Sequence, residues 1–133
     1  MRIVLDTNVL ISSFIGRGIS HKVLEHCVRN HTVVTSQFIL DELREKLTGK
    51  FEYSSETADE SVELLKSRME VVTPKPLSAP VCRDADDDNI LATALAGQCE
   101  LIITGDKDLL VLEQMNDIKI VNPATFAQTE SIE

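Results

Sequence analysis

The feature that most constrains the fold is a regular alternation of short β-branched runs with longer amphipathic runs. Five runs have the apolar character of buried strands: Arg2–Leu5, Thr32–Thr35, Val71–Thr73, Leu101–Thr104 and Ile118–Val121. Strands that alternate with helices form parallel sheets with both faces covered by helices. The sequence therefore predicts an α/β fold, a three-layer α/β/α sandwich around a mainly parallel five-stranded sheet.

Four longer runs carry the apolar spacing of helices. One begins near Ser20 and a second is capped by Ser36, because serine oxygens accept hydrogen bonds from the first helical turn. A third spans about Ser55–Met69, with apolar residues on a single face. The fourth spans Asp87–Ala96 and is followed by Gly97, in the place that glycine commonly takes after a helix.

Length and composition indicate one soluble domain. With 133 residues, 43% of them hydrophobic, the chain suits a single core; we expect a domain over residues 1–127 and a flexible C-terminal tail over residues 128–133. No apolar run approaches the roughly 18 residues that span a bilayer, and no secretory signal is evident, so we expect a cytoplasmic protein without membrane contact. The scattered Cys27, Cys82 and Cys99 are predicted to be structural thiols.

The charge of the chain limits how it could bind nucleic acid. It has 13 Lys and Arg against 22 Asp and Glu, a formal net charge of -9. A general nucleic-acid binder needs cations to neutralise phosphates, and this chain also lacks the aromatic residues of an RNA-stacking sheet. A negative chain can still attract an anionic substrate where carboxylates hold a divalent cation, because the ion inverts the local charge.

Acidic side chains from separate segments are expected to meet at one edge of the sheet. Asp6 directly follows the first strand, and Asp106 lies just beyond the fourth. Asp87 and Asp88 stand at the start of a helix, and Glu42 lies within the helix capped by serine. Ligands of open α/β sheets gather where the carboxyl ends of strands stop. Carboxylates crowded there repel one another unless a cation is bound, and an all-oxygen ligand set selects Mg²⁺ or Mn²⁺ over zinc.

Such ions support phosphodiester hydrolysis, since they activate water and neutralise charge on the leaving oxygen. No serine or cysteine nucleophile paired with a histidine is apparent. His21, His26 and His31 fall on or just after one predicted helix. The chemistry predicted from the residues is therefore metal-dependent cleavage of a phosphodiester.

Four motifs occur in a characteristic order. They are Asp6–Leu10 (DTNVL), the isolated Glu42, Asp87–Ala94 (DDNILATA) and Ile103–Asp108 (ITGDKD). In this order they resemble the motifs of PIN-domain ribonucleases, and more narrowly those of VapC-like toxins of prokaryotic toxin–antitoxin pairs. The resemblance spans nearly the whole chain. It implies an endoribonuclease that uses Mg²⁺ or Mn²⁺, an RNA substrate, a protein antitoxin and a homodimer.

The resemblance also implies roles for individual residues. In the family the third acid usually stands three positions before the first apolar residue of an Ile-Ala-Ala-like run, so Ile90 selects Asp87, with Asp88 as an adjacent competitor. Asn8 and Thr104 are implied to support the ligands or to orient substrate. The residues implied to hold the metal, and so to be catalytic, are Asp6, Glu42, Asp87 and Asp106.

Two other functions remain open for the same residues. Asp6 could be the phosphorylated nucleophile of a phosphotransfer or phosphatase domain, with Lys107 as the late lysine, although Asn8 stands where such sites commonly have a second aspartate. The chain could also be a non-catalytic PIN-like binding module.

Two of the acids also have structural interpretations. Glu42 could be a solvated residue paired with Lys46 one helical turn later. Asp108 is predicted to cap a short helix that begins near Leu109.

Overall fold

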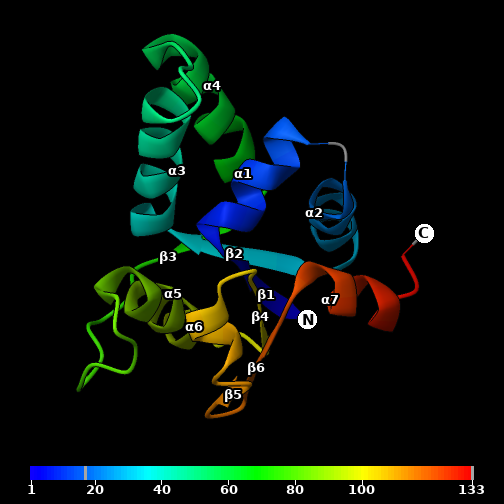
Figure 1. Cartoon of the computed structure of the whole chain (residues 1–133), viewed down its shortest axis with the longest axis vertical. Helices are drawn as coiled ribbons and strands as arrows, with labels where there is room; N and C mark the ends of the chain where they lie inside the picture. The colour runs from blue at the N-terminus through cyan, green and yellow to red at the C-terminus, as the bar shows by residue number, and fades with distance from the viewer. Residues whose placement is uncertain (17, 133) are drawn as a thin grey trace.

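The computed structural model describes residues 1–16 and 18–132, which form six strands and seven helices (Figure 1). The strands are β1 (Arg2–Leu5), β2 (Thr32–Ser36), β3 (Glu70–Val72), β4 (Leu101–Ile103), β5 (Gln114–Met115) and β6 (Ile118–Val121). The helices are α1 (Thr7–Ile15), α2 (Ile19–Asn30), α3 (Gln37–Gly49), α4 (Ser55–Lys66), α5 (Ala85–Ala96), α6 (Lys107–Leu110) and α7 (Pro123–Thr129).

The strands form one sheet in the order β3-β2-β1-β4-β6-β5. All neighbouring pairs are parallel except β5 and β6, which are antiparallel. All five predicted strands are present, and the prediction of a mainly parallel sheet is confirmed. The additional strand β5 has only two residues, too few to produce a detectable pattern of alternation.

The order of the strands explains the layers. The chain moves from β1 through β2 to β3 in one direction across the sheet, and it then returns to the other side of β1 as β4 and β6. Right-handed crossovers place helices on one face in the first direction and on the opposite face in the second. Accordingly α1–α4 cover one face, and α5 and α6 lie on the other (Figure 1). The predicted three-layer sandwich is confirmed.

Helix α1 is not predicted by the sequence pattern. The consecutive residues Val9, Leu10 and Ile11 are all buried, and two of the other buried residues, Thr7 and Ser13, are polar, so the apolar residues do not follow a 3.6-residue period. The chain enters it without a loop. The backbone N–H of Asp6 donates to the Ile103 carbonyl (3.0 Å), while the Asp6 carbonyl accepts from Val9 (3.0 Å) and Leu10 (3.1 Å). Asp6 is thus fixed at the junction of strand and helix.

The segment expected to be a flexible tail is tied to the domain throughout its described part. Helix α7 crosses the expected boundary after residue 127 and ends at Thr129. The backbone N–H of Ile132 donates to the Ala127 carbonyl (2.8 Å), and the Ile132 side chain packs against the core. Phe126, which is 2% exposed, supplies the apolar anchor of this segment. Residue 133 lies outside the described residues.

The three cysteines are free thiols, with Cys27 and Cys99 buried and Cys82 half-buried. Burial raises the pKa of Cys27 to about 12 and the pKa values of Cys82 and Cys99 to about 11. The protonated thiol is a poor nucleophile and a poor metal ligand, so these groups behave as small apolar side chains at neutral pH. Among the described helices, none combines the length and apolar character needed to cross a bilayer.

Candidate active site

The order in which the chain adds strands to the sheet reverses at β1, and this reversal creates the place where a ligand would bind. Strands β2 and β4 flank β1, but the chain leaves β1 toward β2 and returns to β4 only after β3 and α5. A crevice forms beyond the carboxyl ends of strands at such a switch point. Asp6 follows β1 directly, and Thr104 and Asp106 follow β4. The two strand-end aspartates therefore stand on either side of this crevice.

A cavity of about 150 Å³ lies at the crevice, and most of its wall is acidic. It brings together the four acids implied to hold a metal, which come from the end of β1, from α3, from α5 and from the start of α6. We call it the acid cavity. Its lining residues are Asp6, Asn8, Glu42, Lys46, Asp84, Asp86, Asp87, Ile90 and Asp106.

Thr104 links the two strand-end aspartates. Its hydroxyl donates to Oδ2 of Asp6 (2.6 Å) and accepts from the backbone N–H of Asp106 (3.0 Å). The Thr104 side chain is fully buried, so both hydrogen bonds are shielded from water. The orientation of the Asp6 carboxylate is thereby fixed.

The prediction that Asp108 caps α6 is wrong. The helix begins at Lys107 and its cap is Asp106, whose Oδ1 accepts from the backbone N–H of Asp108 (2.8 Å). The helix therefore starts two residues earlier than its apolar pattern indicated. Asp108 instead pairs with the Arg83 guanidinium (2.8 Å). Its carboxylate also approaches those of Asp87 and Asp106, and the three offer oxygens within 4.8 Å of one another.

The structure distinguishes the adjacent residues Asp87 and Asp88. Asp87 is 7% exposed and lines the acid cavity. Oδ1 of Asp88 accepts the backbone N–H groups of Cys82 (2.8 Å) and Val81 (3.3 Å), which ties down the loop before α5. Asp88 is therefore occupied in holding a loop, and Asp87 is the acid that faces the cavity.

Glu42 and Lys46 form the α3 side of the acid cavity. The Lys46 ammonium lies 3.9 Å from the Glu42 carboxylate and donates to Oδ1 of Asn8 (3.0 Å). The helical pair suggested as an alternative role for Glu42 is present, and it lies in the wall of the cavity. Lys46, Asp84 and Asp86 were not predicted as cavity residues. The spacing of Lys46 from Glu42, one turn along the same helix face, is the signal that could have found it.

Burial and nearby negative charge raise the pKa values of Asp6 and Asp87 in the acid cavity. Burial, and then the negative charge of Asp106, raise the pKa of Asp87 to about 7. Burial also raises the pKa of Asp6, against the hydrogen bond from Thr104 that lowers it. The described residues lining the cavity supply carboxylate and amide oxygens and include no histidine or cysteine. This donor set fits a Mg²⁺- or Mn²⁺-type ion, whose charge would relieve the repulsion.

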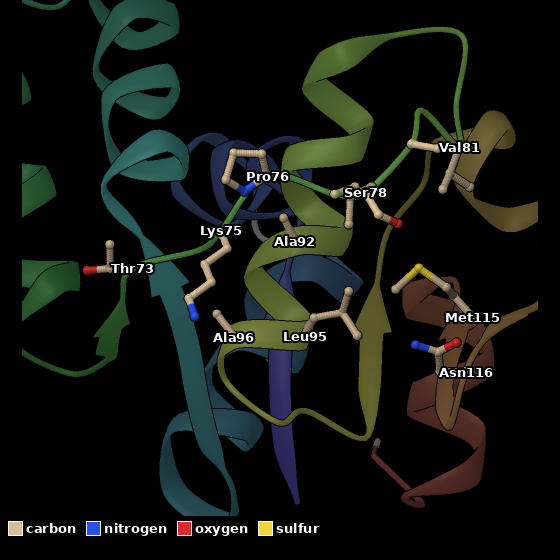
Figure 2. A pocket seen from close by; sticks show the side chains of 12 residues that line it. Thr73, Lys75, Pro76, Ser78, Val81, Ala92, Leu95, Ala96, Met115 and Asn116 are labelled. Carbon is tan, nitrogen blue, oxygen red and sulfur yellow. The ribbon is translucent and has the colours of Figure 1, made fainter.

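A larger cavity, of about 620 Å³, has a different character (Figure 2). It lies between the loop after β3, which includes Lys75 and Ser78, and the last turns of α5 at Leu95. Met115 and Asn116 close its other side. The 12 residues that line it include no carboxylate, imidazole or thiol. Size alone therefore does not identify the functional site, because the carboxylates that could bind a metal ion line the acid cavity.

Fold and cavity together define an α/β protein with an oxygen-donor site at the switch point of a parallel sheet. The sequence model of the PIN domain matches residues 2–108. The uncharacterized protein MJ1680 of Methanocaldococcus jannaschii is 33% identical over 127 residues, covering 92% of this chain and 81% of that protein. The chain belongs to the PIN domain family.

Solved structures show the same fold. VapBC2 from Rickettsia felis, bound to a DNA fragment from its promoter, matches with a TM-score of 0.65 and 16% identity, covering 92% of this chain and 98% of the matched chain. VapBC-1 from nontypeable Haemophilus influenzae matches with a TM-score of 0.66 and 22% identity, covering 93% of this chain and 99% of the matched chain. The likeness extends over the whole sandwich.

Proposed function

We propose that this chain is an endoribonuclease that hydrolyses RNA phosphodiester bonds with Mg²⁺ or Mn²⁺. The observation that carries the proposal is that four acids from four separate segments, Asp6, Glu42, Asp87 and Asp106, line one cavity. Membership of the PIN domain family supports it. The raised pKa values in the cavity support it further, because carboxylates crowded in this way are stabilised by a bound cation.

The four acids would hold the metal, which when bound lowers the pKa of water and neutralises charge on the leaving oxygen. The Thr104 hydroxyl keeps the Asp6 carboxylate in one orientation. Lys46 provides a positive group among the acids, placed by Asn8, that can attract a phosphate oxygen of the RNA backbone. Lys46, rather than Lys107, lines the cavity that contains Asp6, which argues against aspartyl-phosphate chemistry with Lys107 as the partner.

The test is cleavage of single-stranded RNA by purified protein with Mn²⁺, with EDTA and with the Asp6→Asn variant. We expect cleavage by the wild type with Mn²⁺, and none with EDTA or by the variant. Asp41→Asn is the matched control, because Asp41 is exposed on α3 and accepts only a hydrogen bond from Gln37 among the contacts described. Undiminished cleavage by the Asp6→Asn variant would overturn the proposal.

We further propose that the chain is the toxin of a toxin–antitoxin pair, that it forms a homodimer and that it acts in the cytoplasm. The VapBC likeness in fold supports this role. The net charge of -9 and the acid cavity suit a basic inhibitory segment of an antitoxin. Expression of the wild type in a bacterial host should arrest growth, whereas the Asp6→Asn variant at equal abundance should not. Equal growth arrest by both would contradict the toxin role.

A further inference from the structure

A second cluster of ionisable side chains lies at the amino end of the sheet, away from the acid cavity. His26 is on α2, His31 directly precedes β2, and Glu130 follows α7. The Nε2 atoms of both histidines face the same carboxylate oxygen of Glu130, at 3.2 Å from His26 and in closer contact with His31. The three residues offer ligand atoms that all lie within 4.8 Å of one another. We call them the histidine cluster.

The imidazole rings are held in place from behind. Phe126 packs edge-on against both of them, with ring centroids 6.1 Å from His26 and 6.2 Å from His31. The second ring nitrogen of each histidine also has a neighbour. Nδ1 of His31 lies 3.0 Å from the amino group of Met1, and Nδ1 of His26 lies 3.3 Å from the Asn30 amide. Both neighbours are hydrogen-bond donors, so they fix the rings with Nδ1 as acceptor, and Nε2 carries the proton that faces Glu130 until an ion takes its place.

We propose that His26, His31 and Glu130 form a binding site for a divalent transition-metal ion of the Zn²⁺ class. Two imidazoles and one carboxylate are a common three-residue zinc ligand set, with a fourth position left for water. Two ligands of a tetrahedral zinc ion lie about 3.3 Å apart at usual bond lengths, close to the separation of His26 Nε2 and Glu130 Oε1. Nitrogen donors select Zn²⁺, Ni²⁺ or Co²⁺ over Mg²⁺.

The surroundings of the cluster fit a bound ion. Its side chains are partly exposed, at 25% for His26, 12% for His31 and 24% for Glu130, so an ion could enter from solvent. A cavity of about 240 Å³ reaches His26 and is also lined by Asn30 and Ile132. A bound ion would join α2, the start of β2 and the segment after α7.

The test measures Co²⁺ and Zn²⁺ binding to untagged full-length protein in excess Mg²⁺, which occupies oxygen-donor sites. We expect one Co²⁺ with visible ligand-field bands, displaced by Zn²⁺, and a rise in Tm of about 5 to 10 °C when free Zn²⁺ is near 100 times Kd. His26→Gln and His31→Gln should each weaken Zn²⁺ binding at least about 10-fold. His21→Gln is the matched control, because His21 is paired with Glu25 on α2 and is outside the cluster.

A second measurement uses the wild type alone, so it does not depend on variants that fold. On addition of Zn²⁺, the Nε2 resonances of His26 and His31 should shift and those of His21 should not. Equal binding by the wild type and both cluster variants, absence of binding in Mg²⁺, or unmoved Nε2 resonances would overturn the proposal. Its outcome is independent of RNA cleavage, because no residue of the acid cavity takes part.

Discussion

The acid cavity and the histidine cluster lie at opposite ends of the same parallel strands, and their carboxylates have opposite surroundings. In the acid cavity, burial and then the nearby carboxylate of Asp106 raise the pKa of Asp87. In the histidine cluster, Glu130 lies among imidazole nitrogens and its pKa is lowered. Ionisation of Asp87 therefore destabilises the folded protein, whereas ionisation of Glu130 stabilises it.

This difference shows how the environment of a carboxylate decides what it can bind. Several carboxylates crowded together favour a hard cation, so the acid cavity matches Mg²⁺ or Mn²⁺. A carboxylate that shares its space with imidazoles matches a softer ion of the Zn²⁺ class. The two sites should therefore respond differently to pH, to metal identity and to neutralising substitutions.

The largest effect should come from removing a charge in the acid cavity. Glu42→Gln is expected to lower kcat/KM for RNA cleavage by about 100-fold, equal to roughly 2.7 kcal/mol, because a metal ligand is lost. The neighbouring Asp41→Asn should leave it within about twofold, since Asp41 is outside the cavity. Steady-state cleavage of a labelled RNA in Mn²⁺ checks this. Equal losses for both variants would mean that general charge, rather than position in the cavity, sets the rate.

The next effect is on stability in EDTA, where the two carboxylates should behave in opposite ways. The pKa of Asp87 rises from 3.8 to about 7 on folding, so the folded state favours the protonated carboxyl. The stability that this proton adds to the folded protein is fully present below pH 3.8 and is lost as pH rises through 7. Asp87→Asn should therefore be more stable than the wild type at pH 8, by roughly 1 to 3 kcal/mol. Denaturant unfolding from pH 4 to pH 8 measures this difference.

For Glu130 the sign reverses. Its pKa in the folded protein is lowered from 4.5, so the charged carboxylate stabilises the fold. This stabilisation is present above pH 4.5 and is lost as pH falls through the pKa of the folded protein. Glu130→Gln should be less stable than the wild type at pH 8, and the difference should shrink at acid pH. If both substitutions stabilise the protein, or both destabilise it, the contrast between the two sites does not hold.

A smaller loss of activity should follow from removing the hydroxyl that orients Asp6. Thr104→Val keeps the size and shape of the side chain but removes the hydrogen bond to Asp6 Oδ2. We expect about a 10-fold fall in cleavage and a weaker apparent affinity for Mn²⁺, which is typical when a residue that supports a metal ligand is lost. Thr104→Ser, which retains the hydroxyl, should restore most of the activity. Failure of serine to do so would assign the loss to packing.

The smallest effect should separate the adjacent aspartates. Asp88→Asn should lower the free energy of unfolding by about 1 kcal/mol, because one amide oxygen replaces a carboxylate that accepts from the N–H groups of Val81 and Cys82. Cleavage per folded molecule should change little. A loss of cleavage as large as that of Asp87→Asn, with stability unchanged, would reverse the roles assigned to the two residues.

The fold was largely predictable because its signals are local. Strands β1 and β6 have the boundaries that the apolar runs indicated, and Asp6 and Asp106 could be placed at strand ends. Helix α1 was not predictable, since its three apolar buried residues are consecutive and its other buried residues are polar, which removes the apolar period. Gly97 does follow α5 as predicted, but its φ of -84° needs no glycine. A larger residue at this position is excluded instead by Val34, whose Cγ1 would lie 2.6 Å from an added Cβ.

The parts of the sites that sequence could not show depend on distant contacts. The expected flexible tail contains Glu130, which contacts His31 across 99 positions of the chain. No local pattern encodes that contact. Lys46 could be paired with Glu42 by helical spacing, but its hydrogen bond to Asn8 depends on how α3 packs beside α1. Sequence patterns thus located the acids, and tertiary packing decided their neighbours.

The most direct test of the central claim is a crystal structure of the protein soaked in Mn²⁺ and measured for anomalous scattering. The account predicts a manganese peak in the acid cavity, coordinated by carboxylate oxygens from the four acids Asp6, Glu42, Asp87 and Asp106. A cavity without a peak, in protein from a preparation that cleaves RNA in the same Mn²⁺ concentration, would contradict it.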